Sequence, residues 1–378
     1  MLKRIFDQSA YIDLKSRALP VRHISVSRFQ IEEHGVIIFG AGVHGKYIAD
    51  SLTAAHIHPV CFVDSAAKDL AATYKNIPIY PPEHLKDIGD SYVLLSGSYA
   101  NEMILTCEGY GVTNWIFPPA ISSFLFIGCE LGFTFAEMDA EAGIEECFSL
   151  LEDEESRAVF KETINFHCTF DKTLLSYYDK DSYFSASLKG MIDYSHFVDA
   201  GAFDGDTLRD WLSHVVKDNK PFSYHAFEPG TSAFHRLSHF IESQPKSIRN
   251  AIVAYPKGLG KEEGQMVLSL DDVASTFSLS SHVNNSSDAV SVVSLDSLNL
   301  SNVSVIKADV EGFELALLEG AQNTIRKFLP TLIISVYHKR DDFYKIPLYV
   351  HELSPQYKLY LRQHAPTYGE LVCYAIPR

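Results

Sequence analysis

The chain has 378 residues, a length that accommodates two domains of ordinary size with a sizeable core in each. Hydrophobic residues make up 46% of the sequence and charged residues 21%, which is typical of a globular protein. The formal net charge of −16 argues against a nucleic-acid backbone or an anionic membrane surface as the partner.

The six cysteines are scattered and form no C-x-x-C pair, which predicts reduced thiols in a cytoplasmic protein rather than disulfides or a zinc site. The N-terminus lacks the apolar core of a signal peptide. The most apolar window, residues 115–135, is interrupted by Pro118, Pro119, Gly128 and Glu130, and falls short of the roughly 20 apolar residues of a membrane helix. We therefore expect a cytoplasmic protein without a membrane span; whether it forms a homo-oligomer stays open.

The first α/β unit contains a glycine fingerprint between a strand and a helix. Gly40, Gly42 and Gly45 follow the strand that begins at Val36, and Asp64 ends the next strand. The spacing is close to the roughly 20 residues expected between a dinucleotide fingerprint and its ribose-binding acid. We predict a Rossmann-like domain over residues 1–130. Its turn either binds a nucleotide or nucleotide-sugar or serves packing alone, because few further strand–helix units follow.

Residues 131–180 are acidic and place apolar residues at helical spacing, which predicts a helical connector with a solvated charged face. A second α/β domain is expected over residues 181–378. It opens with a buried strand at Phe197, followed by a turn with two glycines and then by a helix from Leu208.

The turn after this strand is acidic, since Asp199, Asp204 and Asp206 lie in or beside it. A phosphate-binding loop requires free backbone amides and a helix N-terminus without negative charge. An acidic turn instead suits a ligand with hydroxyls and a positive centre.

Further strands are predicted at 223–228, 251–255, 303–309 and 332–338, with a terminal antiparallel hairpin at 357–364 and 370–376. In a mostly parallel sheet the strand ends meet at one crevice. That edge is expected to collect Asp199, Glu228, Asp309, His338, Arg362, His364 and Glu370. An acid after the second strand suits ribose hydroxyls, so this set matches S-adenosylmethionine better than a dinucleotide pyrophosphate.

Residues from about 180 onward resemble the FkbM family of S-adenosylmethionine-dependent methyltransferases. The resemblance is carried by Phe197–Thr207, Ala226–Pro229, Ile306–Glu314, Leu318–Ala321 and Ile334–His338. The Asp-x-Glu-Gly-x-Glu segment, followed by a Gly-Ala helix, is its most specific part. The family implies a class I methyltransferase sheet and O-methylation of hydroxyls on polyketides or glycans. The N-terminal third is similar to Rossmann-like domains of bacterial surface-sugar enzymes.

The residues expected to contact the cofactor lie at the strand ends and in the turns that follow them. They are Asp199, Ala200, Gly201, Ala202, Asp204, Gly205, Asp206, Thr207, Glu228, Pro229, Gly258, Leu259, Ser275, Thr276 and Asp309.

Methyl transfer to a hydroxyl needs in-line approach and a base that takes the hydroxyl proton. His338 is the first candidate for that base because histidine titrates near neutrality; the alternatives are Asp309, Glu311 and His364. Lys307 and Arg362 are expected either to take part in catalysis or to form structural ion pairs.

Asp309, Glu311 and His338 could also coordinate Mg²⁺, which would lower the pKa of the acceptor hydroxyl, so the metal stays open.

The sequence thus predicts an S-adenosylmethionine-dependent O-methyltransferase acting on a small-molecule or glycan hydroxyl. One alternative is an NAD(P)-dependent sugar oxidoreductase or epimerase built on Gly40–Gly45 and Asp64. The other is a non-catalytic nucleotide-binding scaffold.

Overall fold

The computed structural model describes residues 2–17, 33–54, 56–67, 72–96, 100–116, 135–169, 174–215, 221–269, 276–278, 289–365 and 369–378. In this part of the chain, no helix combines the length and the apolar character that a membrane span requires. The five cysteines that are described are all buried and free, which agrees with the prediction of reduced thiols.

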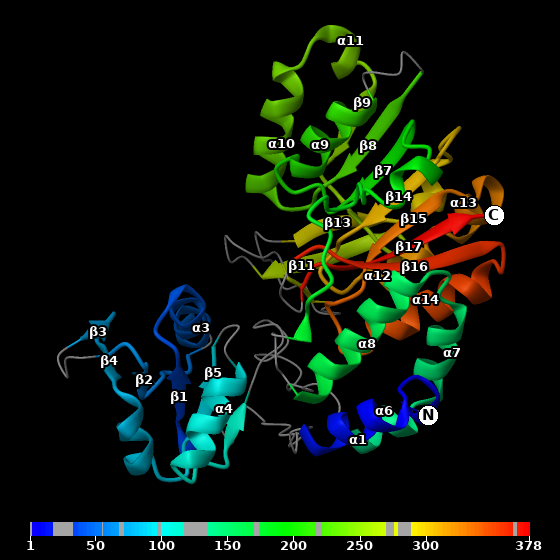
Figure 1. The fold of residues 1–378 in the computed structure, drawn as a ribbon. Helices are drawn as coiled ribbons and strands as arrows, with labels where there is room; N and C mark the ends of the chain where they lie inside the picture. The colour runs from blue at the N-terminus through cyan, green and yellow to red at the C-terminus, as the bar shows by residue number, and fades with distance from the viewer. Residues whose placement is uncertain are drawn as a thin grey trace. The chain divides into compact units, whose positions relative to one another are not determined.

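The chain divides into two compact units (Figure 1). The N-terminal unit comprises residues 1–141 and 162–175, and the C-terminal unit comprises residues 142–161 and 176–378. The segment 131–180, predicted as a separate connector, is divided between the two units. Its helices are α6 (Phe135–Ala140), α7 (Ala142–Leu150) and α8 (Glu154–Thr169).

The N-terminal unit contains a six-stranded sheet of order β3-β4-β2-β1-β5-β6. The strands are β1 (Val36–Phe39), β2 (Cys61–Val63), β3 (Thr73–Tyr74), β4 (Ile77–Tyr80), β5 (Tyr92–Leu95) and β6 (Trp115–Ile116). All pairs are parallel except β3 with β4, and β1, β2 and β5 are buried throughout. The helices are η1 (Leu2–Arg4), α1 (Gln8–Arg17), α3 (Val43–Ala54), η2 (Pro82–Asp87) and α4 (Ala100–Gly109).

The C-terminal unit is built on a seven-stranded sheet of order β16-β17-β15-β14-β7-β8-β9. The strands are β7 (His196–Ala200), β8 (Ser223–Phe227), β9 (Ile252–Tyr255), β14 (Val305–Ala308), β15 (Thr331–Ser335), β16 (Tyr357–Gln363) and β17 (Leu371–Pro377). β17 is antiparallel to both of its neighbours, β15 and β16, and all other neighbouring pairs in this sheet are parallel. The predicted mostly parallel sheet with a terminal antiparallel hairpin is therefore confirmed.

Helices pack on the sheet through apolar side chains at helical spacing. The helices are η4 (Lys189–Met191), α9 (Asp206–Val215), α10 (Thr231–Ser243), α11 (Lys246–Arg249), η6 (Leu295–Leu298), α12 (Glu314–Glu319), α13 (Gln322–Phe328) and α14 (Asp342–Leu353). Trp211 of α9 and Leu237 of α10 join Phe197 and Tyr224 in one buried core, and Figure 1 shows both helices beside β7 and β8.

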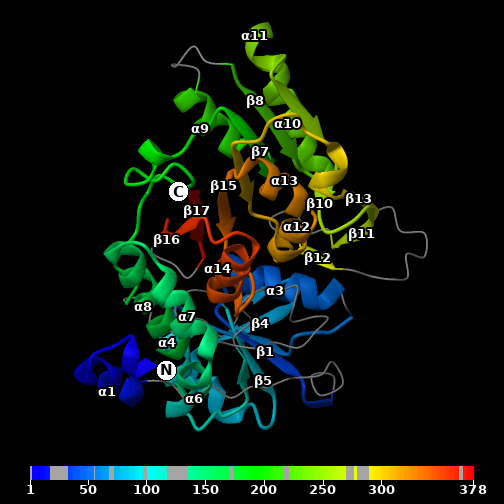
Figure 2. The ribbon, with the colours of Figure 1, turned by 90° about the vertical axis from the view of Figure 1, so that its right-hand side faces the viewer.

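A second, four-stranded sheet of order β10-β13-β11-β12 lies in sequence between β9 and β14. Its strands are β10 (Gly258–Leu259), β11 (Gly264–Ser269), β12 (Thr276–Ser278) and β13 (Ala289–Val293), grouped on one side of α12 and α13 in Figure 2. The sequence did not indicate the assembly of a separate sheet here. Its Gly258, Leu259 and Val292 form one wall of the cavity described next.

Candidate functional site

A cavity of about 260 Å³ lies at the carboxyl ends of the seven-stranded sheet, where sheets of this topology bind ligands. Side chains and loops from β7, β8, β14, β15 and β17 meet there. The lining residues are Tyr183, Gly201, Phe203, Asp206, Thr207, Phe227, Glu228, Pro229, Gly258, Leu259, Val292, Lys307, Asp309, Val310, Glu311, Phe313, Tyr337 and Glu370.

The turn after β7 approaches β14 so closely that it requires glycine. Gly201 has φ +78°, and a Cβ there would lie 1.8 Å from the carbonyl oxygen of Asp309. Gly205 has φ +91° and packs against Leu237 of α10. Gly201 therefore lines the cavity, whereas Gly205 fixes the start of α9 behind it.

Glu228 follows β8 and is 5% exposed at the cavity wall. Its Oε2 accepts a hydrogen bond from Phe203 N at 2.9 Å, and its Oε1 accepts one from Gly230 N at 2.7 Å. Burial raises the pKa of this carboxyl. Each carboxylate oxygen can accept a further hydrogen bond, so the side chain is suited to hold a pair of ligand hydroxyls.

A buried ion pair supports the turn from below. Lys307 Nζ lies 3.1 Å from Asp199 Oδ1, and the side chains are 2% and 0% exposed. The same ammonium donates to Gly201 O at 2.8 Å, and Tyr224 donates to Asp199 Oδ2 at 2.5 Å. Burial alone would lower the pKa of Lys307, but Asp199 and the other nearby acids outweigh it and raise that pKa. Asp199 thus lies beneath the cavity rather than in its wall.

The other half of the cavity is formed by residues after β14, β15 and β16. Tyr183 donates to Asp309 Oδ2 at 2.7 Å, and Tyr337 donates to Asp309 Oδ1 at 3.4 Å. Burial would raise the pKa of Asp309, but Lys307, His338 and the hydrogen bond from Tyr183 lower it. Asp309 is therefore a stably ionised group at the centre of this half.

His338 is surrounded by carboxylates on both of its ring nitrogens. Nδ1 lies 2.9 Å from Glu314 Oε1. Nε2 lies 3.4 Å from Asp309 Oδ1 and 3.6 Å from Glu311 Oε2. Burial favours the neutral ring, but Glu314, Asp309 and Glu311 together raise the pKa of His338 to about 10. At neutral pH the ring is an imidazolium, which has no lone pair with which to accept a proton.

Glu311 differs from His338 in both position and protonation. Its side chain lines the cavity and is 38% exposed, and its backbone is held at φ +53°. Burial is the main reason that its pKa is raised to about 7. A carboxylate with this pKa is half ionised near neutrality, as a general base requires.

Asp309, Glu314 and His338 each offer a potential metal-ligand atom within 4.8 Å of the others. Glu311, which the sequence suggested in place of Glu314, is not in this set. The imidazolium of His338 already supplies a positive charge at this point, and a divalent cation would require the ring to lose its proton. In the metal-free arrangement His338 is the counter-ion of the acids, and the same three atoms stay candidate ligands for a divalent cation.

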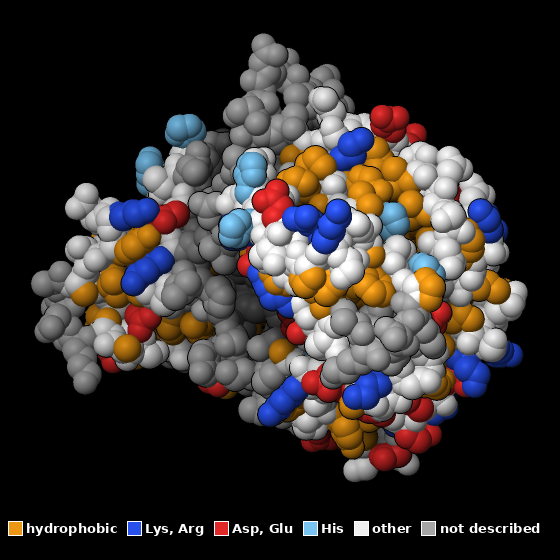
Figure 3. Space-filling view, turned by 90° about the horizontal axis from the view of Figure 1, so that it is seen from above, with side chains coloured by type: hydrophobic (Ala, Val, Ile, Leu, Met, Phe, Trp, Pro, Cys, Tyr) orange, Lys and Arg blue, Asp and Glu red, His pale blue; other side chains and the backbone are white. Residues whose placement is uncertain are grey.

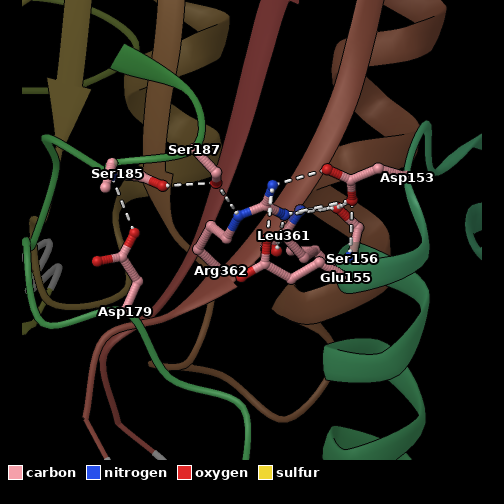
Figure 4. Close-up of polar contacts among 9 residues, drawn as sticks. Asp153, Glu155, Ser156, Asp179, Ser185, Ser187, Leu361 and Arg362 are labelled. Atoms are coloured by element: carbon pink, nitrogen blue, oxygen red, sulfur yellow. Dashed lines mark hydrogen bonds and ion pairs between the residues drawn. The ribbon is translucent and has the colours of Figure 1, made fainter.

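Arg362 lies in β16, is not among the residues that line the cavity, and is directed toward the start of α8 (Figure 4). Its guanidinium donates to Asp153 Oδ2 at 2.7 Å, to Ser156 Oγ at 3.0 Å and to Ser187 Oγ at 3.1 Å. The side chain is 2% exposed and also pairs with Glu155 at 3.2 Å. Of its two predicted roles, the contacts support the structural ion pair.

His364 is also outside the cavity lining. Its Nε2 lies 2.7 Å from Tyr374 Oη, its Nδ1 lies 2.7 Å from Asp179 O, and burial lowers its pKa. Both nitrogens are engaged within the fold, so His364 connects the end of β16 with Tyr374 of β17 and with the segment at Asp179.

Five of the predicted cofactor residues that the structure describes lie outside the cavity lining, namely Asp199, Ala200, Ala202, Asp204 and Gly205. Ala200 and Ala202 are fully buried, and Asp204 pairs with Arg209 at 2.9 Å outside the lining. Ser275 lies outside the described residues, and Thr276 is described only as backbone of β12. Gly205 packs against Leu237 of α10, as described above.

Four lining residues have non-glycine backbones in the left-handed region: Tyr183 (φ 61°), Phe203 (44°), Glu311 (53°) and Glu370 (65°). Such conformations are costly and gather at functional sites. Tyr183, Phe203 and Tyr337 were not among the predicted site residues, whereas Glu370 was expected at this edge of the sheet, although not as a cofactor-binding or catalytic residue. The sequence offered only a positional signal for Tyr337, which directly precedes His338.

In the N-terminal unit, the glycine fingerprint forms the turn between β1 and α3. A Cβ at Gly40 would lie 2.3 Å from Ser96 Oγ, and a Cβ at Gly45 would lie 1.8 Å from Gly40 O. Packing therefore explains both glycines. A Cβ at Gly42 would meet no heavy atom within 4 Å, so packing does not explain this one.

Asp64 follows β2, as predicted, and holds the same turn. Its Oδ2 accepts from Ala41 N at 2.6 Å and its Oδ1 accepts from Ala66 N at 2.8 Å.

Comparison with known proteins bears on the C-terminal unit. Residues 199–359 match the family model described as the methyltransferase FkbM domain. No curated protein is significantly similar to the chain. The crystal structure of methyltransferase FkbM from Methylobacillus flagellatus KT is 18% identical, covers 97% of this chain and 98% of its own, and gives a TM-score of 0.66. At that identity the likeness supports the shared fold.

Two further structures align over smaller parts of the chain. UDP-D-quinovosamine 4-dehydrogenase from Vibrio fischeri is 26% identical over 24% of this chain and 81% of its own, with a TM-score of 0.20. A putative rRNA-methylase from Clostridium thermocellum is 9% identical over 51% of this chain and 92% of its own, with a TM-score of 0.32. These scores are too low to support an argument.

The family match spans β7 to β16, and it includes most of the residues that line the cavity. The C-terminal unit of this chain therefore contains an FkbM methyltransferase domain.

Proposed function

We propose that the chain is an S-adenosylmethionine-dependent O-methyltransferase whose reaction takes place in the cavity at the carboxyl ends of β7, β8 and β14. The observation that carries this proposal is that the two sides of the cavity are lined by different types of residue. A hydroxyl-binding acid and an apolar wall lie on the β7–β9 side, and a cluster of acids and phenols lies on the β14–β17 side.

The residues on the first side fit the cofactor. Glu228 presents two carboxylate oxygens suited to ribose hydroxyls, and Leu259 and Val292 offer an apolar wall for an adenine ring. Gly201 keeps the turn free of a side chain. When bound, S-adenosylmethionine supplies an electrophilic methyl group and leaves as S-adenosylhomocysteine.

Glu311 is proposed as the general base. Its carboxylate takes the proton of the acceptor hydroxyl as the oxygen bonds to the methyl carbon, which contributes about 10²–10⁴-fold to the rate. His338 holds the ionised acids in place as their counter-ion. Lys307 is a positioning residue, because it fixes Gly201 through the backbone and contacts Asp199 below the cavity.

The acceptor is proposed to be a hydroxyl of a sugar, a glycan intermediate or a related natural product. Aromatic rings of Tyr183, Phe313 and Tyr337 line the second half of the cavity, and carboxylates beside them can accept hydrogen bonds from neighbouring hydroxyls. Both features suit a polyhydroxylated ring.

A second ligand site is proposed at the turn of the N-terminal unit, for a nucleotide or nucleotide-sugar. β1 lies between β2 and β5, so the turn after it is at the switch point of the sheet, and Gly42 leaves room for close approach. The cytoplasmic location expected from the sequence is likewise a proposal.

Isothermal calorimetry with S-adenosylhomocysteine tests the central proposal. Wild-type protein should bind it, and Glu228→Ala should weaken binding by about 10- to 100-fold, equivalent to ~1.4–3 kcal/mol. Absence of binding by the wild type, or unchanged binding by Glu228→Ala, would remove the basis for the proposal.

A further inference from the structure

The acids of the cavity outnumber the cations that could neutralise them. The lining contains five carboxylates, namely Asp206, Glu228, Asp309, Glu311 and Glu370, and one basic residue, Lys307. Lys307 is 2% exposed and is paired with Asp199, an acid beneath the cavity. Its single charge is therefore shared between Asp199 beneath the cavity and Asp309 in the wall.

His338 adds one positive charge, and three carboxylates share it. Glu314, Asp309 and Glu311 all lie within 3.6 Å of its ring nitrogens. Like charges held this close to one counter-ion leave the cluster with net negative charge.

Glu370 lies in the cavity wall without a cation of its own. Among the described residues, no Lys, Arg or His nitrogen lies within ion-pair distance of its carboxylate. Burial and the charge of Asp309 raise its pKa, and the charges of Lys307 and His338, which lie beyond ion-pair distance, offset this only in part. Its backbone is nevertheless held at φ +65°, which keeps this side chain at the cavity.

S-adenosylmethionine carries a sulfonium, an ammonium and a carboxylate, so it would bring one net positive charge to five lining acids. A neutral acceptor would leave the remainder uncompensated, and a phosphorylated acceptor would add repulsion. A protonated amine would pair with the acids and lie against the rings of Tyr183 and Tyr337, which attract cations.

We propose that the acceptor is a hydroxyl compound with a protonated amine, such as an amino sugar, and that Glu370 is the residue that selects the amine. This inference rests on the function proposed above. It also implies that sugar phosphates and nucleotide-linked sugars are excluded from this cavity.

The test compares three probes that share one ring, namely glucosamine, glucose and glucose 6-phosphate. Binding of each to protein saturated with S-adenosylhomocysteine is measured by ligand-observed NMR titration at low ionic strength. Glucosamine should bind at least about tenfold more tightly than glucose, and glucose 6-phosphate should bind more weakly than glucose. The preference for glucosamine should fall as salt is raised.

Three variants assign the effect to Glu370. Glu370→Gln keeps the shape and removes the charge, so it should bring the affinities for glucosamine and glucose to within about twofold. Glu370→Asp retains the charge and should keep part of the preference. Glu352→Gln on α14 is the matched control, because this exposed acid does not line the cavity. Unchanged melting temperatures verify that each variant is folded.

Equal binding of glucosamine and glucose, tighter binding of glucose 6-phosphate, or a preference that persists in Glu370→Gln would overturn the inference. Failure of glucosamine to bind would overturn it as well. Failure of S-adenosylhomocysteine to bind would instead contradict the proposed function, so the two outcomes are distinguishable.

Discussion

Glu311 and His338 are both candidates for the general base, and the groups around them give them different pKa values. Both follow strands of the same sheet, and both are titratable. The carboxylates around His338 raise its pKa to about 10, whereas burial raises that of Glu311 to about 7. The base is therefore expected to be the acid and not the histidine.

Glu311→Gln should lower kcat by about 10²–10⁴-fold, because the variant cannot take the hydroxyl proton. Its affinity for S-adenosylhomocysteine should stay within about twofold of wild type. In the wild type, kcat should rise with pH through about 7, as the carboxylate form of Glu311 becomes populated. Carboxyl ¹³C NMR of Glu311 should show the same titration, and a variant with the wild-type rate would contradict the role.

His338 should make the stability of the protein depend on alkaline pH. Its pKa is raised in the folded state, so its stabilisation is complete below about pH 6.5 and is lost as pH rises through about 10. Urea unfolding from pH 6.5 to 10.5 should show this decline in the wild type. His338→Gln should be less stable by about 3–5 kcal/mol at pH 7 and should lack that part of the decline. Parallel curves for both proteins would argue against the imidazolium.

The sequence placed Asp309, Glu311 and His338 at one edge, because the carboxyl ends of parallel strands meet there. It ranked His338 first as the base, and the ranking proposed here differs because it depends on the charges of Glu314 and Lys307, whose distances are set by the packed fold. The same holds for Glu370, for which no described Lys, Arg or His nitrogen lies within ion-pair distance.

At the level of elements, the strand–turn–helix units were well predicted, and their connections less so. The β7 turn follows directly from its glycines and apolar strand. By contrast, α14 begins at Asp342 and continues through Pro347, which in the sequence has the appearance of a helix breaker. The four-stranded sheet was missed because its strands are short, β10 with 2 residues and β12 with 3.

Arg362 shows why a strand-end residue need not belong to the site. Its partner Asp153 is separated from it by 209 residues, and Asp153 also accepts from Ser156 N at 2.8 Å as the cap of α8. Sequence spacing cannot reveal such a contact. The result is a connection between the first turn of α8 and the edge of the sheet (Figure 4).

Arg362→Met should therefore destabilise the C-terminal unit by about 3 kcal/mol, because it removes a buried cation and leaves two acids unpaired. Lys358→Met is the matched control on the same strand. Its pair with Glu152 at 3.4 Å is 41% and 29% exposed, so its loss should cost about 0–1 kcal/mol. Denaturant unfolding measures both variants. Equal effects, or loss of S-adenosylhomocysteine binding by folded Arg362→Met, would contradict a purely structural role.

For the whole molecule, two mostly parallel sheets raise the question of which one holds the reaction. The N-terminal fingerprint is the better-known pattern, yet packing explains two of its three glycines. The C-terminal cavity combines a family match, a ligand-sized space and a concentration of left-handed backbones. On the face seen in Figure 3, acidic and basic side chains are interspersed.

The two proposed sites should respond independently to substitution. Gly42→Ala should abolish any rise in melting temperature caused by a uridine diphosphate sugar, because its Cβ enters the space left for the ligand. It should leave the affinity for S-adenosylhomocysteine unchanged. Glu228→Ala should show the reverse pattern. Scanning fluorimetry with each ligand is the measurement, and a uridine diphosphate sugar without effect on the wild type would contradict the second site.

The most direct test of the account is a crystal structure of the protein with S-adenosylhomocysteine. The account predicts ligand density in the cavity of the C-terminal unit, with the ribose beside Glu228 and the sulfur directed toward the half that contains Asp309 and Glu311. Density at the Gly40–Gly45 turn instead, or a ribose without contact to Glu228, would contradict it.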